Sequence, residues 1–262
     1  MKAKKSFGQH FLNNHSIAEE IAQAIHQMPF SKNLLEVGPG QGMLTQYLIR
    51  ENEHLKVVEL DRDMIPILQK KFPKLEIIES DFLKLDLKEI FSGKPFCLVG
   101  NYPYNISSQI VFKMLDMHEL IPAMVGMFQK EVAERIISPP GSKKFGIISV
   151  FTQLYYDGSL LINVDKSEFD PPPNVQSAVI LLKRKKDVQE PNNPKLFRSI
   201  VKQSFGMRRK MIRKCIKTFI PDHDFISDPM LDLRPEKLST IDFIDLSNKV
   251  DAIIKERNSS KP

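Results

Sequence analysis

Residues 33–42 have the sequence Asn-Leu-Leu-Glu-Val-Gly-Pro-Gly-Gln-Gly, and they are the clearest structural signal in the chain. The apolar run Asn33–Val37 predicts a short buried strand, and the closely spaced glycines after it predict a tight turn. A helical spacing of apolar residues follows the turn, at Met43, Leu44, Tyr47 and Leu48. A strand, a glycine turn and a helix in this order let the backbone approach a nucleotide closely, because glycine has no side chain. The segment therefore predicts an α/β sheet with a nucleotide site at Gly38 and Gly40.

Carboxylates follow at the ends of the next two predicted strands. Residues 54–60 carry Glu59, twenty-one positions after Gly38, where an acidic residue of such folds binds ribose hydroxyls. Residues 75–79 lead into Asp81 and Phe82, and we expect this carboxylate to meet an adenine amino group with the ring beside it. A single strand-end carboxylate is most often only solvated. Two on consecutive strands, beside a glycine turn, favour a nucleoside site.

A second polar motif follows the next predicted strand, Phe96–Gly100. Its sequence from Asn101 to Asn105 is Asn-Tyr-Pro-Tyr-Asn. The Asn101 amide can accept a hydrogen bond from an exocyclic amino group, and Pro103 offers a carbonyl with no competing N–H. The Tyr104 ring can stack on a planar base. The motif fits an adenine amino group held for methylation, although a plain strand-to-helix turn is the simpler interpretation of these residues alone.

Taken together, these motifs resemble the S-adenosylmethionine-dependent rRNA adenine N6-dimethyltransferases. The matching segments occur in the family's order, at residues 4–12, 36–42, 58–61, 80–81, 101–107, 169–179 and 208–214. The resemblance implies further contacts to the methyl donor, S-adenosylmethionine, which we call the donor. These contacts are at Gln9, His10, Leu12 and Leu60. Asn101 is implied to contact the donor and also to act in catalysis. The chain departs from the family at two positions, where His10 replaces an Asn of some members and Tyr102 replaces the usual Leu.

The resemblance also implies a fold and a reaction. The fold is a Rossmann-like class I methyltransferase sheet with a small all-helical carboxyl-terminal domain. The cofactor is S-adenosylmethionine, which leaves as S-adenosylhomocysteine. The substrate is 16S rRNA in the small ribosomal subunit or its precursor, dimethylated late in assembly at two adjacent adenines of its 3′-terminal hairpin. We expect Phe169, which precedes three prolines, to sandwich the unstacked adenine against Tyr104; a core aromatic residue is the simpler alternative.

Positive charge is concentrated in the last third of the chain. Residues 183–262 carry a net charge of +8, whereas the whole chain carries +6. Eight basic residues and no acidic one lie between Arg198 and Lys217. On a helical wheel the basic residues lie on the side opposite to the apolar ones, which predicts a basic amphipathic helix. The apolar side consists of Met211, Ile212, Cys215, Ile216 and Phe219. The imbalance favours RNA as partner over a solvated face or a membrane surface. The residues expected to bind RNA are Arg208, Arg209, Lys210, Arg213 and Lys214.

The predicted organisation is a catalytic domain at residues 1–186, a polar linker at 187–194 and a helical RNA-binding domain at 195–262. Alternating strands and helices predict a parallel sheet whose fifth strand is 122–128, with an antiparallel edge pair at 160–164 and 177–183. The two cysteines and six scattered histidines form no metal motif, so we expect no metal. The two cysteines predict a cytoplasmic protein with reduced thiols, and the lack of a long apolar run predicts no membrane span. We also expect a monomer.

Other functions remain open at this point. An NAD-dependent dehydrogenase shares the glycine turn and Glu59, but its glycine spacing differs and it does not explain the basic segment. A large-subunit rRNA methyltransferase that confers macrolide resistance shares the donor motifs. A ribosome-assembly or transcription factor built on this fold binds RNA without methylating it, which intact Asn101, Pro103 and Tyr104 disfavour.

Overall fold

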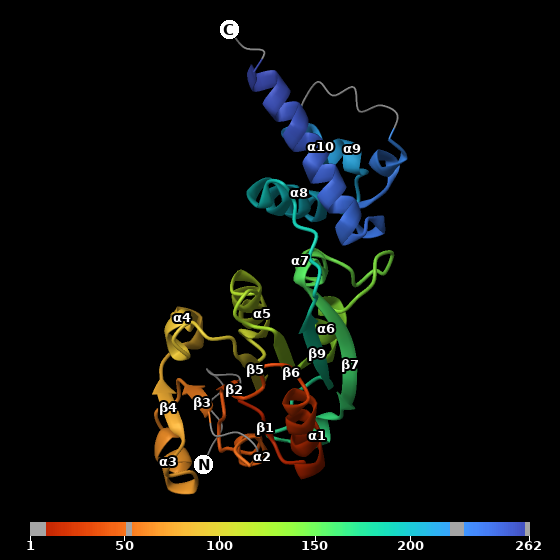
Figure 1. Cartoon of the computed structure of the whole chain (residues 1–262). Helices are drawn as coiled ribbons and strands as arrows, with labels where there is room; N and C mark the ends of the chain where they lie inside the picture. The colour runs from red at the N-terminus through yellow and green to blue at the C-terminus, as the bar shows by residue number, and fades with distance from the viewer. Residues whose placement is uncertain (1–8, 51–53, 221–227, 260–262) are drawn as a thin grey trace. The chain divides into compact units, whose positions relative to one another are not determined.

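The computed structural model describes residues 9–50, 54–220 and 228–259 (Figure 1). The strands are β1 (Phe11–Leu12), β2 (Asn33–Val37), β3 (His54–Glu59), β4 (Glu76–Glu79), β5 (Cys97–Asn101), β6 (Ala123–Gln129), β7 (Tyr156–Val164), β8 (Phe169–Asp170) and β9 (Ser177–Arg184). The α-helices are α1 (His15–His26), α2 (Thr45–Leu48), α3 (Ile65–Lys71), α4 (Leu87–Ile90), α5 (Ser107–Asp116), α6 (Lys130–Ile136), α7 (Ile147–Tyr155), α8 (Pro194–Gly206), α9 (Ile212–Cys215) and α10 (Thr240–Ser259).

The chain divides into two compact units. The first comprises the described residues up to Glu134 together with Tyr156–Arg184, and the second comprises Arg135–Tyr155 together with the described residues from Lys185 onward. The predicted boundaries differ at one segment, since residues 135–155 were expected in the catalytic domain. Their aromatic rings explain the difference. Phe145 lies 6.1 Å from Phe205 of α8, and Phe151 lies 6.1 Å from Phe197, so this segment completes the core of the helical unit.

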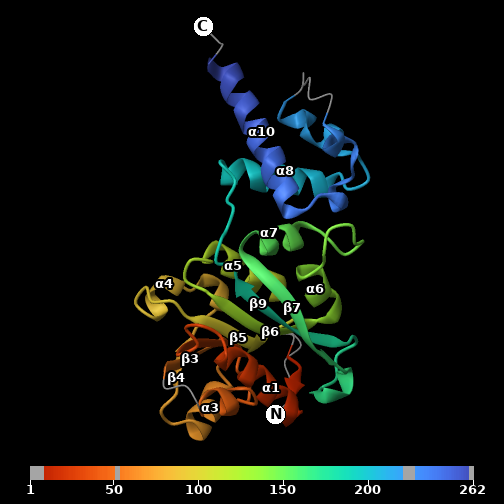
Figure 2. The same cartoon turned by 45° about the vertical axis from the view of Figure 1, so that its right-hand side comes forward.

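A seven-stranded sheet forms the first unit, in the order β4-β3-β2-β5-β6-β9-β7. The first five strands run parallel, whereas β9 runs antiparallel to both β6 and β7. Figure 2 shows β7 and β9 side by side at one edge of the sheet. The predicted parallel sheet with an antiparallel edge pair is confirmed, and each predicted strand agrees closely with its observed bounds except β7, which starts earlier, at Tyr156.

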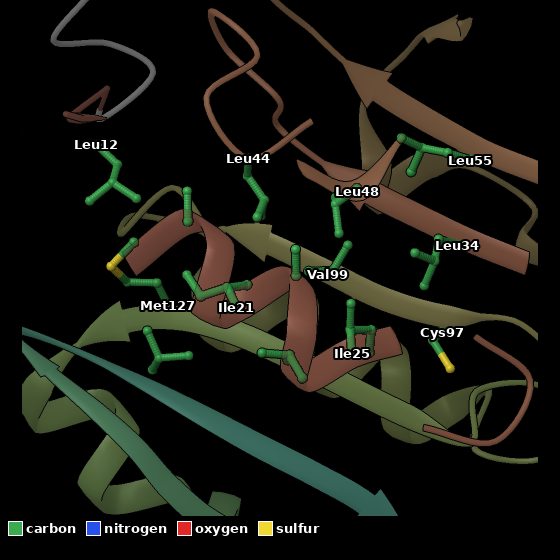
Figure 3. Packing of buried hydrophobic residues seen from close by; sticks show 14 of the residues in the cluster. Leu12, Ile21, Ile25, Leu34, Leu44, Leu48, Leu55, Cys97, Val99 and Met127 are labelled. Atoms are coloured by element: carbon green, nitrogen blue, oxygen red, sulfur yellow. The ribbon is translucent and has the colours of Figure 1, made fainter. Parts of the chain in front are cut away.

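Alternate residues of the parallel strands build a core on each face of the sheet. On one face, α1 packs Ile21 and Ile25 against the strands that carry Val99 and Met127, as Figure 3 shows. The first turn of α1 is capped by Asn14, whose side chain accepts a hydrogen bond from the Ile17 N–H. This packing fixes the sheet, and it leaves the carboxyl ends of β2, β3, β4 and β5 at one edge, where parallel α/β sheets bind ligands.

Tyr102 occupies a slot in the sheet that two glycines leave open. Its ring is 1% exposed, and it lies against Gly100 of β5 and Gly126 of β6. A Cβ added at Gly126 would lie 2.1 Å from Cε2 of the Tyr102 ring, and one at Gly100 would lie 2.9 Å from its Cε1. The larger residue at position 102 is therefore accommodated by missing side chains on its own strand and on the neighbouring strand.

A two-stranded antiparallel ribbon joins β1 to β8, with Phe11 opposite Asp170 and Leu12 opposite Phe169. The Asn13 N–H extends the ribbon by donating to the Glu168 carbonyl at 2.8 Å, and the Asn14 side chain donates to the Glu168 carboxylate at 2.8 Å. Sequence patterns did not predict this ribbon, because each strand contains only two residues.

The second unit is helical, and α8 packs against α10 through the rings of Phe205 and Phe243, whose centroids lie 5.9 Å apart. The predicted basic amphipathic helix is only partly correct. The structure has the short helix α9 followed by a 3₁₀ turn at Ile216–Thr218, and Arg209 and Lys210 precede α9 in a turn. Met211, expected on the apolar side, is 48% exposed, because the chain at that position is not yet helical.

We expect Gly126→Ala to destabilise the protein by about 2–3 kcal/mol, because the new methyl group overlaps the Tyr102 ring. In a Tyr102→Leu background the same substitution should cost clearly less, since the smaller side chain leaves room for the methyl group. Urea unfolding of the two single variants and the double variant gives the coupling free energy. Equal losses in both backgrounds would contradict the proposed slot.

Candidate functional site

A cavity of about 450 Å³ opens at the carboxyl ends of β2, β3, β4 and β5. This volume is within the range of nucleotide and drug-sized ligand sites. All but one of the residues predicted to bind the donor or to act in catalysis line the cavity. They are Gln9, His10, Leu12, Gly38, Gly40, Glu59, Leu60, Asp81, Phe82, Asn101, Pro103 and Tyr104.

The glycine turn after β2 forms one wall of the cavity. Gly40 has a φ of +55°, a conformation that favours glycine, and a Cβ at this position would lie 3.0 Å from the Phe11 ring. The Gly38 N–H donates to the Val58 carbonyl at 2.9 Å, which anchors the turn to β3. Bare backbone at Gly40 thus faces the cavity where a larger residue would not fit.

Glu59 ends β3 opposite this turn. One carboxylate oxygen accepts from the Gly40 N–H at 3.1 Å and the other from the Asp61 N–H at 2.8 Å. Burial raises the pKa of Glu59, although these backbone donors act in the opposite direction. Each oxygen keeps a further lone pair, so this oriented carboxylate can accept the two hydroxyl groups of a ribose.

Asp81 and Phe82 stand at the start of the loop after β4. One Asp81 oxygen caps this loop by accepting from the Leu83 N–H at 2.9 Å. The Lys113 ammonium group of α5 donates to the Leu83 carbonyl at 2.9 Å and to the Leu85 carbonyl at 2.5 Å. The same ammonium group lies 5.4 Å from the centroid of the Phe82 ring. Lys113, which sequence reasoning did not select, therefore holds the loop that carries both predicted adenine contacts.

Residues 9–12 cross the cavity as a strap. The Gln9 side chain donates to the Asp61 carboxylate at 2.8 Å, the Phe11 ring covers Gly40, and Leu12 is buried in the core. His10 Nδ1 lies 2.7 Å from the Pro171 carbonyl oxygen. The strap thus connects the glycine turn and Asp61 on one side of the cavity to Pro171, which follows β8. Residues 4–8 of the matching opening motif lie outside the described residues.

Asn101 ends β5 and faces the strap. Its Nδ2 donates to the His10 carbonyl at 3.0 Å, so the amide oxygen Oδ1 is the group that remains to accept a hydrogen bond from a ligand. The Pro103 carbonyl accepts from the Ile106 N–H at 3.1 Å and keeps a second lone pair. Two acceptors from one short motif therefore stand at the same cavity, as an amino group requires.

Tyr104 presents its ring to the cavity, and its hydroxyl lies 2.6 Å from the Ser177 hydroxyl oxygen. The His10 ring stacks on Tyr104, with centroids 5.3 Å apart and an interplanar angle of 27°. The Tyr104 ring thus already stacks with one planar ring, that of His10.

Phe169 is the predicted catalytic residue that the structure does not bring to the cavity. Its side chain is 3% exposed and packs in the core with Leu12 of the facing strand. The β1–β8 pairing turns this ring inward, which matches the simpler interpretation of a core aromatic residue next to prolines. The expected sandwich with Tyr104 is not formed in this structure.

Glu36 lines the cavity, but sequence reasoning did not select it. It was passed over because it is a single polar residue within a strand. It is 1% exposed, and the Thr45 hydroxyl donates to its Oε2 at 2.7 Å. Burial raises the pKa of Glu36 to about 8, with the nearby Glu59 carboxylate adding to the effect. The signal in the sequence was a lone carboxylate in the apolar run Leu34–Val37, which has to be buried in a strand covered on both faces.

The predicted RNA-binding residues lie in the second unit and fall into two groups. Arg209, Lys210 and Lys214 are exposed. Arg213 is half-buried and pairs with Asp232, to which its Nε donates at 2.7 Å. Arg208 is also half-buried and contacts Glu236 and the Lys143 carbonyl. The run of basic residues is therefore not a uniform surface.

These cavity residues suit a nucleoside cofactor such as S-adenosylmethionine. The bare backbone at Gly40 suits its methionine chain, and the oriented Glu59 carboxylate suits its ribose. The Asp81–Phe82 pair suits its adenine. Within the described residues, no group of three or more His, Cys, Asp or Glu side chains has the geometry to hold a metal ion. In the same part of the chain, no helix is long and apolar enough to span a bilayer.

Comparisons with known proteins agree with this geometry. A family model described as ribosomal RNA adenine dimethylase matches residues 1–232. A Phocaeicola vulgatus protein named ribosomal RNA small subunit methyltransferase A is 50% identical over 260 residues, which cover 98% of this chain and 92% of that protein. A protein of the same name from Bacteroides thetaiotaomicron is 46% identical over 263 residues, covering 99% and 98% of the two chains.

Solved structures show the same fold. A dimethyladenosine transferase from Plasmodium falciparum superposes with a TM-score of 0.76 at 24% identity, covering 94% of this chain and 98% of that chain. The 23S rRNA methyltransferase ErmE superposes with a TM-score of 0.68 at 23% identity, covering 90% and 98%. At these identities the likeness supports the predicted methyltransferase fold and not the choice of substrate.

We expect Glu36→Gln to change how stability depends on pH. The folded protein keeps the Glu36 proton up to a pKa of about 8, whereas the unfolded chain releases it near 4.5. The wild type should therefore lose stability relative to the variant as pH rises through this window, by up to about 1.4 kcal/mol per pH unit. Urea unfolding from pH 5 to pH 9 measures this difference. Glu76→Gln removes an exposed carboxylate of β4 and is the control. Parallel curves for the wild type and Glu36→Gln would contradict the raised pKa of Glu36.

Proposed function

The chain belongs to the ribosomal RNA adenine dimethylase family, and we propose that it dimethylates N6 of two adjacent adenines in the 3′-terminal hairpin of 16S rRNA. As a member of this family it is an rRNA methyltransferase that uses S-adenosylmethionine. The proposed acceptor chemistry rests on one observation. The acceptors Asn101 Oδ1 and the Pro103 carbonyl line the same cavity as the glycine turn and Glu59.

The choice of the small subunit is supported by the names of the relatives that are 46–50% identical over nearly the whole chain. The large-subunit alternative is supported only by the fold of ErmE, at 23% identity. Membership of the family also removes the dehydrogenase alternative. We further propose that the protein acts late in small-subunit assembly, in the cytoplasm and as a monomer.

In the proposed donor site, Glu59 accepts the ribose hydroxyls, Asp81 accepts the adenine amino group, and Phe82 packs beside the adenine ring. The strap of residues 9–12 forms one wall of this site through Gln9, His10 and Leu12. Leu60 lies beside the ribose. S-adenosylmethionine, when bound, supplies an electrophilic methyl carbon on a sulfonium, and the product is S-adenosylhomocysteine. The protein's part is to hold this carbon in line with the attacking nitrogen and to exclude water.

In the proposed acceptor site, Asn101 Oδ1 and the Pro103 carbonyl each accept one N–H of the adenine amino group before the first transfer. The monomethylated nitrogen keeps one N–H for the second transfer, and the proton released in each transfer passes to solvent. The nitrogen lone pair of adenine is delocalised into the ring, and these two hydrogen bonds favour the pyramidal geometry in which it can attack. Tyr104 stacks on the flipped base, and such stacking contributes about 1–3 kcal/mol per base. In the second unit, Arg209, Lys210 and Lys214 bind phosphates.

The proposal is tested by transfer of labelled methyl groups to small ribosomal subunits that lack adenine methylation, with large subunits in parallel. Nucleoside analysis should find dimethyladenine in small-subunit rRNA alone. Label only in large-subunit rRNA would identify a large-subunit enzyme. No label in either subunit, with donor and RNA binding intact, would favour a non-catalytic assembly factor.

We expect Asn101→Ala to reduce the methyl transfer rate at least about 100-fold, because the loss of one oriented hydrogen bond at a reacting group has this scale. Donor affinity, measured by calorimetry, should stay within several-fold. Asn163→Ala makes the same change on the exposed face of β7 and should leave both quantities unchanged. An unchanged rate for Asn101→Ala would exclude the proposed role.

We expect Glu59→Ala to weaken donor binding by about tenfold or more, since the ribose hydroxyls lose their hydrogen-bond acceptor. Glu79→Ala is a close control, because Glu79 is the register partner of Glu59 on β4 and pairs with Arg62 at the surface. Calorimetric titration with S-adenosylmethionine compares the two variants. Equal affinities would show that the ribose contact is misassigned.

A further inference from the structure

Arg208 joins two segments of the second unit that lie far apart in the sequence. Its guanidinium donates to the Lys143 carbonyl at 2.6 Å, and its Nε lies 3.7 Å from a Glu236 carboxylate oxygen. The Gly141 N–H donates to the Glu236 backbone carbonyl at 2.6 Å. The loop of residues 139–144 is therefore fastened to the 3₁₀ turn at Pro235–Lys237 and to the basic segment 208–214, which we call the basic box.

This fastening has a consequence for charge. Lys143 and Lys144 are exposed on the loop, and Arg209 and Lys210 are exposed just after Arg208. The exposed Lys237 has its Nζ 4.0 Å from the point where a Cβ of Gly141 would lie. We call these five residues, Lys143, Lys144, Arg209, Lys210 and Lys237, the basic patch. Three chain segments contribute to it, and only the segment with Lys143 and Lys144 lies outside the predicted RNA-binding domain at 195–262.

The chemistry of the patch suits a polyanion. Glu236 is held against Arg208 and the loop, so its charge is offset at the base of the patch. Beside the patch Ile212, Cys215 and Ile216 are buried, while Met211 and Leu233 are exposed, so the basic residues do not flank the continuous apolar face with which an amphipathic helix enters a lipid surface. Several cations without a continuous apolar face are typical of a surface that contacts successive phosphates of a nucleic acid backbone.

Building on the proposed function, we propose that loop 139–144 is part of the RNA-binding surface, with Lys143 and Lys144 contacting phosphates. Arg208 then acts as a positioning residue that presents this loop, because its donors are directed at Lys143 and Glu236. This assignment extends the RNA site to a segment that lies between the catalytic motifs in the sequence.

The experiment is binding of a small-subunit rRNA hairpin by the full-length protein at several salt concentrations. Lys143→Glu and Lys144→Glu should each weaken binding about fivefold or more and reduce the slope of log K against log salt by about 1. Lys195→Glu is the matched control. It makes the same charge change at the start of α8, about 18 Å along a 13-residue helix from the basic box. Donor affinity should stay unchanged in all three variants.

The role of Arg208 is tested by Arg208→Met alone and combined with Lys143→Glu. If Arg208 presents the loop, its loss should speed hydrogen exchange at the Gly141 amide and make the further effect of Lys143→Glu small. Additive losses with unchanged exchange would instead make Arg208 a direct phosphate contact and overturn its positioning role.

The two levels of the proposal fail separately. If the wild type transfers no methyl group to small subunits, the proposed function fails. If the wild type methylates them and Lys143→Glu and Lys144→Glu bind RNA as Lys195→Glu does, the function stands and the loop is not part of the RNA surface.

Discussion

The pairing of β1 with β8 is the constraint on which the site depends. It brings Phe11 opposite Asp170 across almost the whole first unit. Closing so long a loop costs conformational entropy, so two short strands can pair only where buried side chains such as Leu12 and Phe169 stabilise them. Once the ribbon is formed, Gln9 and His10 lie at the cavity beside the glycine turn and Asn101. The His10 carbonyl then fixes the orientation of the Asn101 amide. The β1–β8 pairing thus organises both the glycine turn that faces the donor and the motif at Asn101, although it belongs to neither of them.

The two buried carboxylates of the cavity, Glu59 and Glu36, differ in the hydrogen-bond donors around them. Glu59 has two backbone N–H donors that offset part of its burial, whereas Glu36 has one neutral hydroxyl and a pKa of about 8. Near neutral pH, Glu36 therefore holds its proton. Glu59, which has the two backbone donors, is the acid proposed to accept ribose hydroxyls. The Glu59 carboxylate adds to the rise in the pKa of Glu36, because two buried negative charges repel each other.

Local patterns were sufficient to predict the sheet, its antiparallel edge and most of the cavity. Gly38, Glu59, Asp81 and Asn101 follow predicted strands, and parallel strands bring their carboxyl ends together. The patterns failed where long-range packing decides. Phe169 faces the core because of a ribbon with two residues per strand, and Lys113 reaches the donor loop from a helix. The helical wheel placed Met211 inward, but the helix begins only at Ile212. The segment 135–155 joins the helical unit through its aromatic rings, which sequence order does not reveal.

The acceptor motif offers oxygens to the amino group, and the reaction gives a reason. Methyl transfer moves positive charge from the sulfonium to the attacking nitrogen, so the amino N–H groups become stronger hydrogen-bond donors in the transition state. Only groups that interact more strongly with the transition state accelerate the step. An amide oxygen and a peptide carbonyl that accept these N–H groups interact in this way. The Asn101 amide can do so only in one orientation, and the bond from its Nδ2 to the His10 carbonyl selects that orientation. An Asp at this position could not donate that bond, so its acceptor oxygen would lose the fixed orientation.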